Sequence, residues 1–334
     1  MTKHSISFAT GFMTLCALTL AGSFARAQAP DVPVAHRLGT RRSGDVRVGP
    51  QALAKTRLQS GLNLSFGLVD FPRSPYSTAN GINSRGDIVG FYGPNLPAWD
   101  GTEQSYLLHG NSFQEISYPG ASYTGALGIN KSRAIVGWYS GTDGIYHGFL
   151  LKGKKYTNID DPAFQNTIPS NINDSGEIIG EAFDATGNIH GFLFRKGTYT
   201  TFDPPNSINT EPIGINSTGV IVGNFVDENT VAHGFVFQGG QFTTIDYPGA
   251  SSTDLTGIND QGQMIGGYGD DVMVAGDDWP TPNAFLLDHG VFTPLAAPFG
   301  GVEVTWTYTL TGHQFVGLYV DSLGNIEGFE ATLN

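Results

Sequence analysis

Histidine and carboxylate side chains are the residues of this sequence that could support acid–base catalysis or bind a metal. The chain of 334 residues has eight histidines and 30 acidic residues. His147, His190 and His233 each precede Gly-Phe and lie 43 residues apart. Residues that recur at a fixed interval occupy equivalent places in a repeat fold, so a ring of repeats would keep them apart. We interpret these three as structural residues that hydrogen-bond a neighbouring strand or a repeated asparagine, and we predict no catalytic residue.

Known catalytic and metal-binding motifs are missing from the sequence. It has no Gly-x-Ser-x-Gly elbow, no P-loop, no His-Glu-x-x-His and no Cys/His cluster, so we predict no metal centre and no cofactor. Residues 184–188 and 321–325 both read Asp-x-x-Gly-Asn, like half of a calcium loop, but the later Glu of an EF-hand is missing. Asp, Gly and Asn also form turns, which is the favoured interpretation, and Ca²⁺ binding stays an alternative.

A repeat runs through most of the chain. Gly-Ile-Asn or Asn-Ile-Asn recurs with its last residue at Asn83, Asn130, Asn173, Asn216 and Asn259, at spacings of 47, 43, 43 and 43 residues. Seven residues after each Asn, a glycine closes an Ile-Val-Gly-like triplet, and His-Gly-Phe and Thr-Ile-Asp-x-Pro segments follow in several units. The short amide of each Asn is expected to close the turn that follows it.

Each repeat contains four short apolar stretches bounded by Gly, Asn and Asp, the pattern of strands joined by hairpins. We name them strand A (ending in Gly-Ile-Asn), B (Ile-Val-Gly), C (His-Gly-Phe) and D (Thr-Ile-Asp-x-Pro). Four strands per unit of about 43 residues are typical of a β-propeller. A β-solenoid is the main alternative, but its coils are usually shorter.

The two ends of the repeat region predict how the ring closes. Residues 66–72 resemble a strand D with no A, B or C before it, whereas the last unit stops at Asn334 without a strand D. Five complete units and one divided between the termini predict an all-β, six-bladed propeller of four-stranded blades, with the last blade closed by the N-terminal strand. Closure would leave no unpaired sheet edge between the first and last blades.

The repeats resemble the HAF family of extracellular repeats, named for a His-Ala-Phe step after a Gly-Ile-Asn…Ile-Val-Gly run. The resemblance covers essentially residues 66–334, with departures. Gly replaces Ala at 148, 191 and 234, the His position holds Asn283 or Glu327 in late units, and the first unit reads Ser105-Tyr106. The resemblance implies an exported bacterial repeat protein and carries no established activity.

Three insertions interrupt the repeat and contain three of the four tryptophans. Two expand B–C connections, at 93–101 and 269–282, and one expands the D–A connection at 299–306. B–C and D–A connections leave the same face of a propeller, and the first and fifth units would flank the divided blade. Exposed Trp beside Asp in long loops suggests a carbohydrate platform. The other interpretation, slightly favoured, is that the loops cap the propeller, with Trp filling a small core of their own. The candidate ligand-binding residues are Trp99, Asp100, Asp270, Asp271, Asp277, Asp278, Trp279, Glu303 and Trp306.

The first 60 residues differ from the rest of the chain. Residues 1–27 have a basic start, an apolar run and an Ala-x-Ala site, which predicts a signal peptide and a secreted or periplasmic protein. Residues 28–60 are polar and basic and are predicted to be a disordered linker before the propeller at 61–334. The sole cysteine, Cys16, lies in the leader, so no disulfide is expected.

Charge limits the partners. Residues 1–60 carry a net +6 within a chain of −13, and no Lys or Arg follows Lys196. This acidity disfavours nucleic acid and anionic ligands. We expect a monomer with no transmembrane segment in the mature chain. The favoured function is a non-catalytic module that binds polysaccharide or an envelope protein; a glycoside hydrolase or lyase using Asp277 and Asp278, and a purely structural surface protein, are the alternatives.

Overall fold

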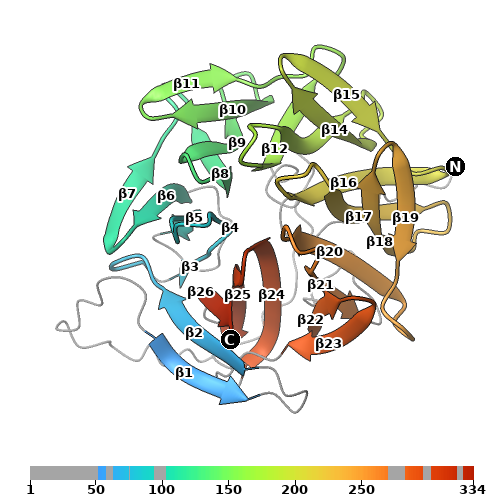
Figure 1. Cartoon of the computed structure of the whole chain (residues 1–334). Helices are drawn as coiled ribbons and strands as arrows, with labels where there is room; N and C mark the ends of the chain where they lie inside the picture. The colour runs from blue at the N-terminus through green and yellow to red at the C-terminus, as the bar shows by residue number, and fades with distance from the viewer. Residues whose placement is uncertain are drawn as a thin grey trace, which may run out of the picture.

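The strands of the chain are arranged as a ring around a central axis (Figure 1). The computed structural model describes residues 52–57, 63–74, 76–93, 103–269, 283–295, 302–321 and 326–334, and it describes side chains in all of these except 52–57, 302–306 and 320–321. The described residues form strands β1 to β26. The predicted all-β propeller is therefore confirmed. The predicted signal peptide lies outside the described residues. Among these residues, no helix is long and apolar enough to span a membrane.

Five hydrogen-bonded sheets make up the ring. The first contains β3 (Tyr76–Ser77), β4 (Gly81–Ile82), β5 (Ile88–Gly93), β6 (Gln104–His109) and β7 (Ser112–Ile116). The second contains β8 (Tyr123–Ile129), β9 (Ala134–Ser140), β10 (Tyr146–Lys152) and β11 (Lys155–Asn158). The third contains β12 (Asn166–Ile172), β13 (Ile178–Phe183), β14 (Ile189–Arg195), β15 (Thr198–Phe202), β16 (Ser207–Ile215), β17 (Ile221–Asp227), β18 (Ala232–Gln238) and β19 (Gln241–Ile245).

Two further sheets complete the ring. The fourth contains β20 (Ser252–Ile258), β21 (Met264–Gly269), β22 (Asn283–Asp288) and β23 (Val291–Leu295). The fifth, here called the seam sheet, has the order β1 (Ala52–Arg57), β2 (Asn63–Val69), β26 (Ile326–Leu333), β25 (Gln314–Asp321) and β24 (Val302–Thr311). In every sheet, strand A lies toward the centre and strand D toward the outside (Figure 1).

The number of sheets differs from the predicted six separate blades. Two neighbouring repeats, β12–β15 and β16–β19, share one eight-stranded sheet because β14 and β16 are joined by a parallel bridge between Ile189 and Asn209. The second and fourth sheets have the predicted four strands, whereas strand A of the first sheet is divided into β3 and β4. The count of six is therefore not confirmed by the hydrogen bonding of the sheets.

The termini meet in the seam sheet. Strand β2 pairs antiparallel with β26, from Leu64 opposite Leu333 to Val69 opposite Gly328. The N-terminal strand thus supplies the strand D that the last repeat lacks. Strand β1 then pairs with β2 as a fifth strand. Its residues, 52–57, fall inside the predicted linker at 28–60.

Turn residues explain why the repeats form antiparallel hairpins. The C–D turns Lys196-Gly197, Gly239-Gly240 and His289-Gly290 have positive φ at both residues, the type I′ geometry that matches the twist of paired strands. The glycine of the Ile-Val-Gly triplet has a different reason. A Cβ on Gly137 would lie 1.9 Å from the carbonyl oxygen of Gly125 on the paired strand A, so only glycine fits there.

The core lies between neighbouring sheets. One cluster joins the seam sheet to the fourth sheet through Phe66, Ile265 and Phe329. Another joins it to the first sheet through Val69, Tyr106 and Val316. Burying one such side chain stabilises the folded protein by roughly 1.5–3 kcal/mol relative to leaving it exposed. The seam is therefore packed on both sides like the other junctions of the ring.

Candidate functional site at the ring seam

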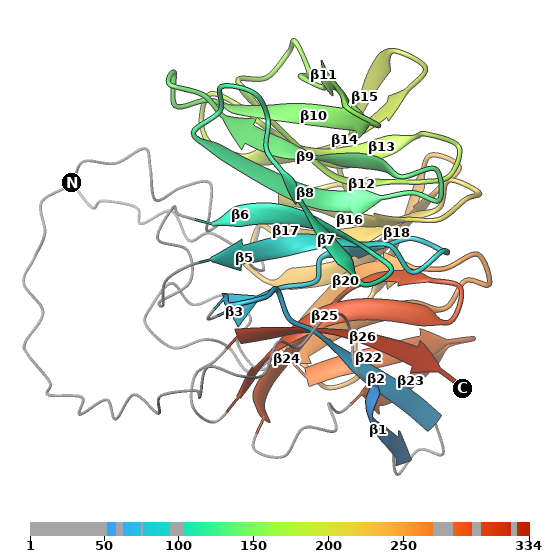
Figure 2. The same cartoon turned by 90° about the vertical axis from the view of Figure 1, so that its left-hand side faces the viewer.

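The two faces of the ring carry different connections. Because each sheet runs up and down, the B–C and D–A connections lie on one face, here called the connection face, and the A–B and C–D turns lie on the other, the turn face. Figure 2 shows the ring from the side, with β5 ending at its left-hand side, which is the connection face. The strand ends therefore locate the three insertions of the sequence.

All three insertions start and finish on the connection face of neighbouring sheets. They join β5 to β6, β21 to β22 and β23 to β24. Strand β24 of the seam sheet packs against β20 and β21 on one side and against β4 on the other. The first and fourth sheets therefore flank the seam sheet, as the sequence predicts for the first and fifth repeats.

The candidate ligand-binding residues are only partly covered by the structure. Most of them lie outside the described residues: Trp99, Asp100, Asp270, Asp271, Asp277, Asp278 and Trp279. Glu303 and Trp306 belong to β24, and the backbone of Trp306 is paired with Leu318. From residue 302 onward, the predicted D–A loop is therefore a strand, because the inner strand of the last repeat starts earlier than its weak pattern indicates.

The repeated histidines bind aspartates, one of them at the end of the neighbouring strand D, so of the two predicted partners the neighbouring strand is the one observed. His190 Nδ1 lies 2.9 Å from Asp203 Oδ2 at the end of strand D, and its Nε2 lies 3.5 Å from Asp184 Oδ2 in the B–C turn. His147 and His233 have the same two kinds of partner, and none of the three bonds the repeated asparagine. Each imidazole thus ties strand C to strand D and to the B–C turn of its own repeat.

Neighbouring aspartates raise the pKa of two of these histidines. Burial lowers the pKa of His190, but the hydrogen bond and charge of Asp203, with those of Asp184, outweigh it and raise the pKa above its usual value. The pKa of His147 is raised in the same way by Asp143 and Asp160. The contacts between histidine and aspartate recur in three repeats. Among the described residues, no group of three His, Cys, Asp or Glu could hold a metal ion.

The calcium-like loop at 184–188 is closed by its own side chains. Asp184 Oδ1 accepts from the backbone N–H groups of Thr186 and Asn188 at 2.8 and 2.9 Å, and Oδ2 accepts from the Asn188 amide at 3.1 Å. The carboxylate therefore forms the turn that the sequence favours. Of the second loop, residues 322–325 lie outside the described residues.

Stacked aromatic rings join successive repeats on the connection face. Tyr118 at the end of one strand D stacks on Tyr139 of the next repeat, with ring centroids 3.6 Å apart and planes 6° from parallel. Phe71 with Tyr92, and Tyr247 with Tyr268, repeat this arrangement at 3.5 Å. Such pairs contribute about 0.5–1.5 kcal/mol beyond their buried area, so they serve to fasten one repeat to the next.

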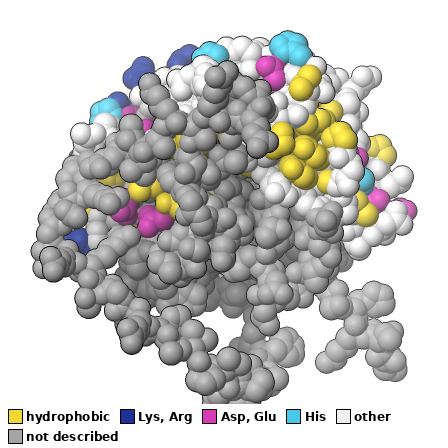
Figure 3. All heavy atoms as spheres, turned by 90° about the horizontal axis from the view of Figure 1, so that it is seen from below, with side chains coloured by type: hydrophobic (Ala, Val, Ile, Leu, Met, Phe, Trp, Pro, Cys, Tyr) yellow, Lys and Arg dark blue, Asp and Glu magenta, His cyan; other side chains and the backbone are white. Residues whose placement is uncertain are grey.

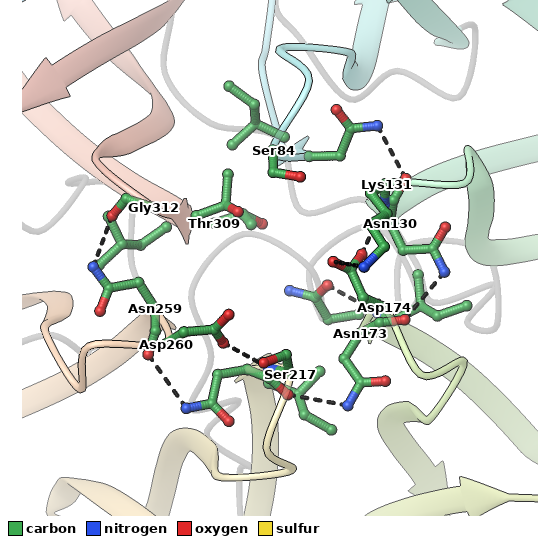
Figure 4. Close-up of a pocket in the computed structure, with 18 of the residues that line it drawn as sticks. Ser84, Asn130, Lys131, Asn173, Asp174, Ser217, Asn259, Asp260, Thr309 and Gly312 are labelled. Carbon is green, nitrogen blue, oxygen red and sulfur yellow. Dashed lines mark hydrogen bonds and ion pairs between the residues drawn. The ribbon is translucent and has the colours of Figure 1, made fainter.

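The repeated asparagines surround the central opening on the turn face (Figure 4). The Oδ1 of each closes its own A–B turn; that of Asn216 accepts from the N–H groups of Thr218 and Val220 at 3.1 and 2.9 Å. The Nδ2 donates to the main-chain carbonyl at the equivalent place in the next repeat, at 3.0, 3.1, 3.0, 3.2 and 2.7 Å around the ring. These amides therefore link successive repeats by hydrogen bonds, a role that the sequence did not predict.

Charge is distributed unevenly around the ring. Every Lys and Arg precedes Gly197, so the fourth sheet and strands β24 to β26 of the seam sheet contain neither. In the view of Figure 3, the described Lys and Arg lie toward the upper and left-hand rim, and hydrophobic side chains gather at the right. The insertions on the fourth and seam sheets therefore start from strands without cationic side chains.

Sequence reasoning also missed three acidic residues inside the ring. Glu181 and Glu211 are buried, and Asp254 is partly buried on the next inner strand. They stand in repeat positions where other units carry residues such as Phe91, Trp138 or Ile168, and this substitution of acid for apolar residue was the available signal.

Comparison with known proteins concerns the fold. No protein-family model and no curated protein matches the sequence. The structure is similar to the fucose-specific lectin from Aleuria aurantia, at 10% identity over 79% of this chain and 96% of that one, with a TM-score of 0.48. It is similar to an AofleA mutant from Arthrobotrys oligospora (12%, 81% and 87%, 0.49) and to the β-propeller domain of the Trilobed protease from Pyrococcus furiosus (12%, 77% and 94%, 0.46).

Proposed function

We propose that the protein is a secreted, non-catalytic β-propeller that binds polysaccharide through the insertions at its seam. The observation that supports this most is the convergence of strand ends: β5–β6, β21–β22 and β23–β24 all open on the connection face of three adjacent sheets. Loops placed together on a rigid scaffold are where proteins usually carry binding residues.

The composition of the insertions favours an uncharged sugar. Trp99 and Trp279 would stack on the faces of sugar rings, and Asp100, Asp277 and Asp278 would accept hydrogen bonds from hydroxyl groups. The strands that bear the two later insertions contain no Lys or Arg, so nothing on them offsets repulsion of an anionic ligand.

A glycan array probed with residues 28–334 tests this function. The wild type is expected to bind a set of neutral glycans, and Trp99→Ala and Trp279→Ala should each weaken binding roughly tenfold, equivalent to about 1.4 kcal/mol. Val291→Ala is the control, since Val291 is 63% exposed on the outer strand β23. Absence of binding to any glycan would contradict the carbohydrate proposal and leave an envelope protein or a purely structural role.

The products released from the glycan distinguish a binding protein from an enzyme. Incubation of the bound glycan with the wild type should release no new reducing or unsaturated ends. Release that is abolished by Asp277→Asn or Asp278→Asn would instead identify a hydrolase or lyase.

We also propose that the chain is a member of the HAF family and that its ring has six blades, if each half of the eight-stranded sheet counts as one. Each half has its own A-to-D order of antiparallel strands. A crystal structure of residues 28–334 would test the count. Export is tested by mass spectrometry of the protein from a bacterial host's medium or periplasm, where the mature chain should begin at Gln28.

A further inference from the structure

Four polar side chains from three successive repeats meet between the inner strands of the eight-stranded sheet and β20. Glu181 lies on β13, Glu211 on β16, Asn224 on β17 and Asp254 on β20. Glu181, Glu211 and Asn224 are only 1–2% exposed. Glu211 is opposite Asn224 in the sheet register, and the Asn224 amide donates to Asp254 Oδ1 at 3.0 Å.

The buried atoms of this cluster that lack a hydrogen-bond partner among the described residues are all acceptors. Glu181 Oε2, both carboxyl oxygens of Glu211 and Asn224 Oδ1 have no hydrogen-bond partner among the described residues. Leaving a buried acceptor unpaired costs about 1–3 kcal/mol, and more if it is charged. Donors are therefore needed inside the cluster, and a carboxylic acid O–H is a donor that Glu181 and Glu211 can supply themselves.

No cationic side chain acts as the donor to these carboxyl oxygens among the described residues. The titratable groups that act on Glu211 are Glu181 and Asp254, which become negative on ionisation. Strand β12 has no titratable residue, and on β14 His190 pairs with Asp203 and Arg195 with Glu177. On β17, Asp227 pairs with His233, and the described part of β24 offers Tyr308. Ionisation of the cluster would thus gather negative charges without a counter-ion.

Next to the cluster, the same layer of the ring is apolar, and Ile168 of this layer is paired with Glu181 itself. Phe91, Trp138 and Ile168 occupy the equivalent positions in earlier repeats and belong to one hydrophobic cluster. An apolar layer would pack the ring without any dependence on pH. Three adjacent repeats have carboxyl groups in this layer instead. These groups make the stability of the ring depend on pH, which packing alone does not require.

We propose that Glu181, Glu211 and Asp254 form a proton-holding site between the inner strands, which stabilises the ring in acid and weakens it as the carboxyl groups ionise. A proton fits this site better than a metal ion, because the described residues contain no group of three ligands placed to hold one. This inference does not depend on the proposed sugar-binding function.

The direction of the pH dependence follows from the proton balance. Burial raises the pKa of Glu181 to about 8 and that of the less buried Asp254 to about 6. Burial also raises the pKa of Glu211, and the charges of Glu181 and Asp254 raise it further, with partial opposition from the Asn224 amide. The folded chain therefore holds protons that the unfolded chain has released. This contribution to stability is full below the unfolded value of 4.5 and is lost as the pH rises to about 8.

Thermal unfolding of residues 28–334 between pH 4 and pH 9 tests the proposal. The melting temperature of the wild type should fall by about 5 °C or more from pH 5 to pH 9. Glu211→Gln keeps the shape of the side chain but cannot ionise, so its fall should be at most half as large. Glu228→Gln, the same change at an exposed position on the β17–β18 turn, should follow the wild type. Parallel curves for the wild type and Glu211→Gln would overturn the proposal.

A spectroscopic readout detects the proton itself. The infrared carbonyl band of a protonated carboxylic acid should be present in the wild type at pH 7, persist in Glu228→Gln and weaken in Glu211→Gln. If Glu211→Gln does not fold, Glu181→Gln replaces it, and absence of the band from the wild type is sufficient to refute the proposal. A rise in melting temperature on adding Ca²⁺ at pH 8, lost in the glutamine variants, would identify a cation site and also overturn it.

Discussion

Asn216 donates its side-chain amide to the main-chain carbonyl of Asn259, 43 residues further along the chain, at a distance of 3.2 Å. Through Oδ1, the same side chain closes the turn of its own repeat. One short amide thus links local structure to the assembly of the ring. Neither a carboxylate, which cannot donate, nor a hydroxyl of shorter reach would do both.

Replacing Asn216 with Asp separates these two roles. Asn216→Asp keeps the oxygen that closes the turn but puts an acceptor against the Asn259 carbonyl. We expect a loss of roughly 1–3 kcal/mol in the free energy of unfolding, measured by denaturant titration at pH 7. Asn206→Asp, at an exposed turn residue, should change it by less than about 0.5 kcal/mol. Equal stability of the two variants would show that the inter-repeat bond contributes little.

Stepwise N-terminal truncation tests the seam. Removal of residues 1–51 keeps β1 and β2 and should leave the melting temperature unchanged. Removal of residues 1–72 deletes β2 and exposes the edge of β26 from Gly328 to Leu333, so we expect a lower melting temperature and aggregation. Size-exclusion chromatography and thermal unfolding measure both effects. A chain that starts at residue 73 and stays monomeric with unchanged stability would contradict closure by β2.

Periodic residues made the ring predictable from the sequence. Asn216 and its counterparts recur because every repeat has the same A–B turn, which this side chain closes. The unmatched strand at 66–72 indicates that the termini meet. Strand β1 was not predictable in this way, because an outer strand can pair through its backbone without any apolar pattern. The shared eight-stranded sheet was also hidden, since a single bridge between Ile189 and Asn209 leaves no mark on the repeat.

The chemistry of individual side chains was less predictable than the fold. Equal spacing identified His147, His190 and His233 as equivalent, but their partners come from strand D and the B–C turn, and spacing alone does not show which polar group faces which. Glu211 is the only titratable residue of its strand, β16, and only the folded ring brings it to Glu181 and Asp254. The insertions that carry Trp99 and Trp279 have no counterpart in other repeats, so the repeat gives no guide to their conformation.

Gly148 provides a test of backbone packing. The family that the repeats resemble has Ala at this step, yet a Cβ on Gly148 would lie 2.2 Å from the carbonyl oxygen of Ile159 and 2.7 Å from Pro169. Gly148→Ala should therefore lower the free energy of unfolding by about 1–3 kcal/mol, as overpacking usually does. Gly141→Ala meets only the movable side chain of Asp143 and is the control. If the two substitutions cost the same, the strands must be able to separate at this point.

The pair of His190 and Asp203 predicts a second, distinguishable dependence on pH. Asp203→Asn removes the charge that holds the pKa of His190 above its ordinary value of 6.5, so the pKa measured by NMR titration should fall. A raised pKa in the folded state stabilises the protein below pH 6.5, and this contribution disappears as the pH rises through the folded value. Asp203→Asn should therefore destabilise the protein more at pH 5.5 than at pH 8.5.

The carboxyl cluster loses its stabilising effect over a different pH range from that of the histidine pair. The histidine pair and the carboxyl cluster both stabilise the protein less as the pH rises. The histidine contribution changes only above about pH 6.5, whereas that of Glu181 begins to change near its unfolded value of 4.5. Between pH 4.5 and pH 6, Asp203→Asn should thus retain the slope of the wild type, while Glu211→Gln should flatten it. Flattening of this interval by Asp203→Asn would assign the acid-side dependence to the histidine pairs instead of the buried carboxyl groups.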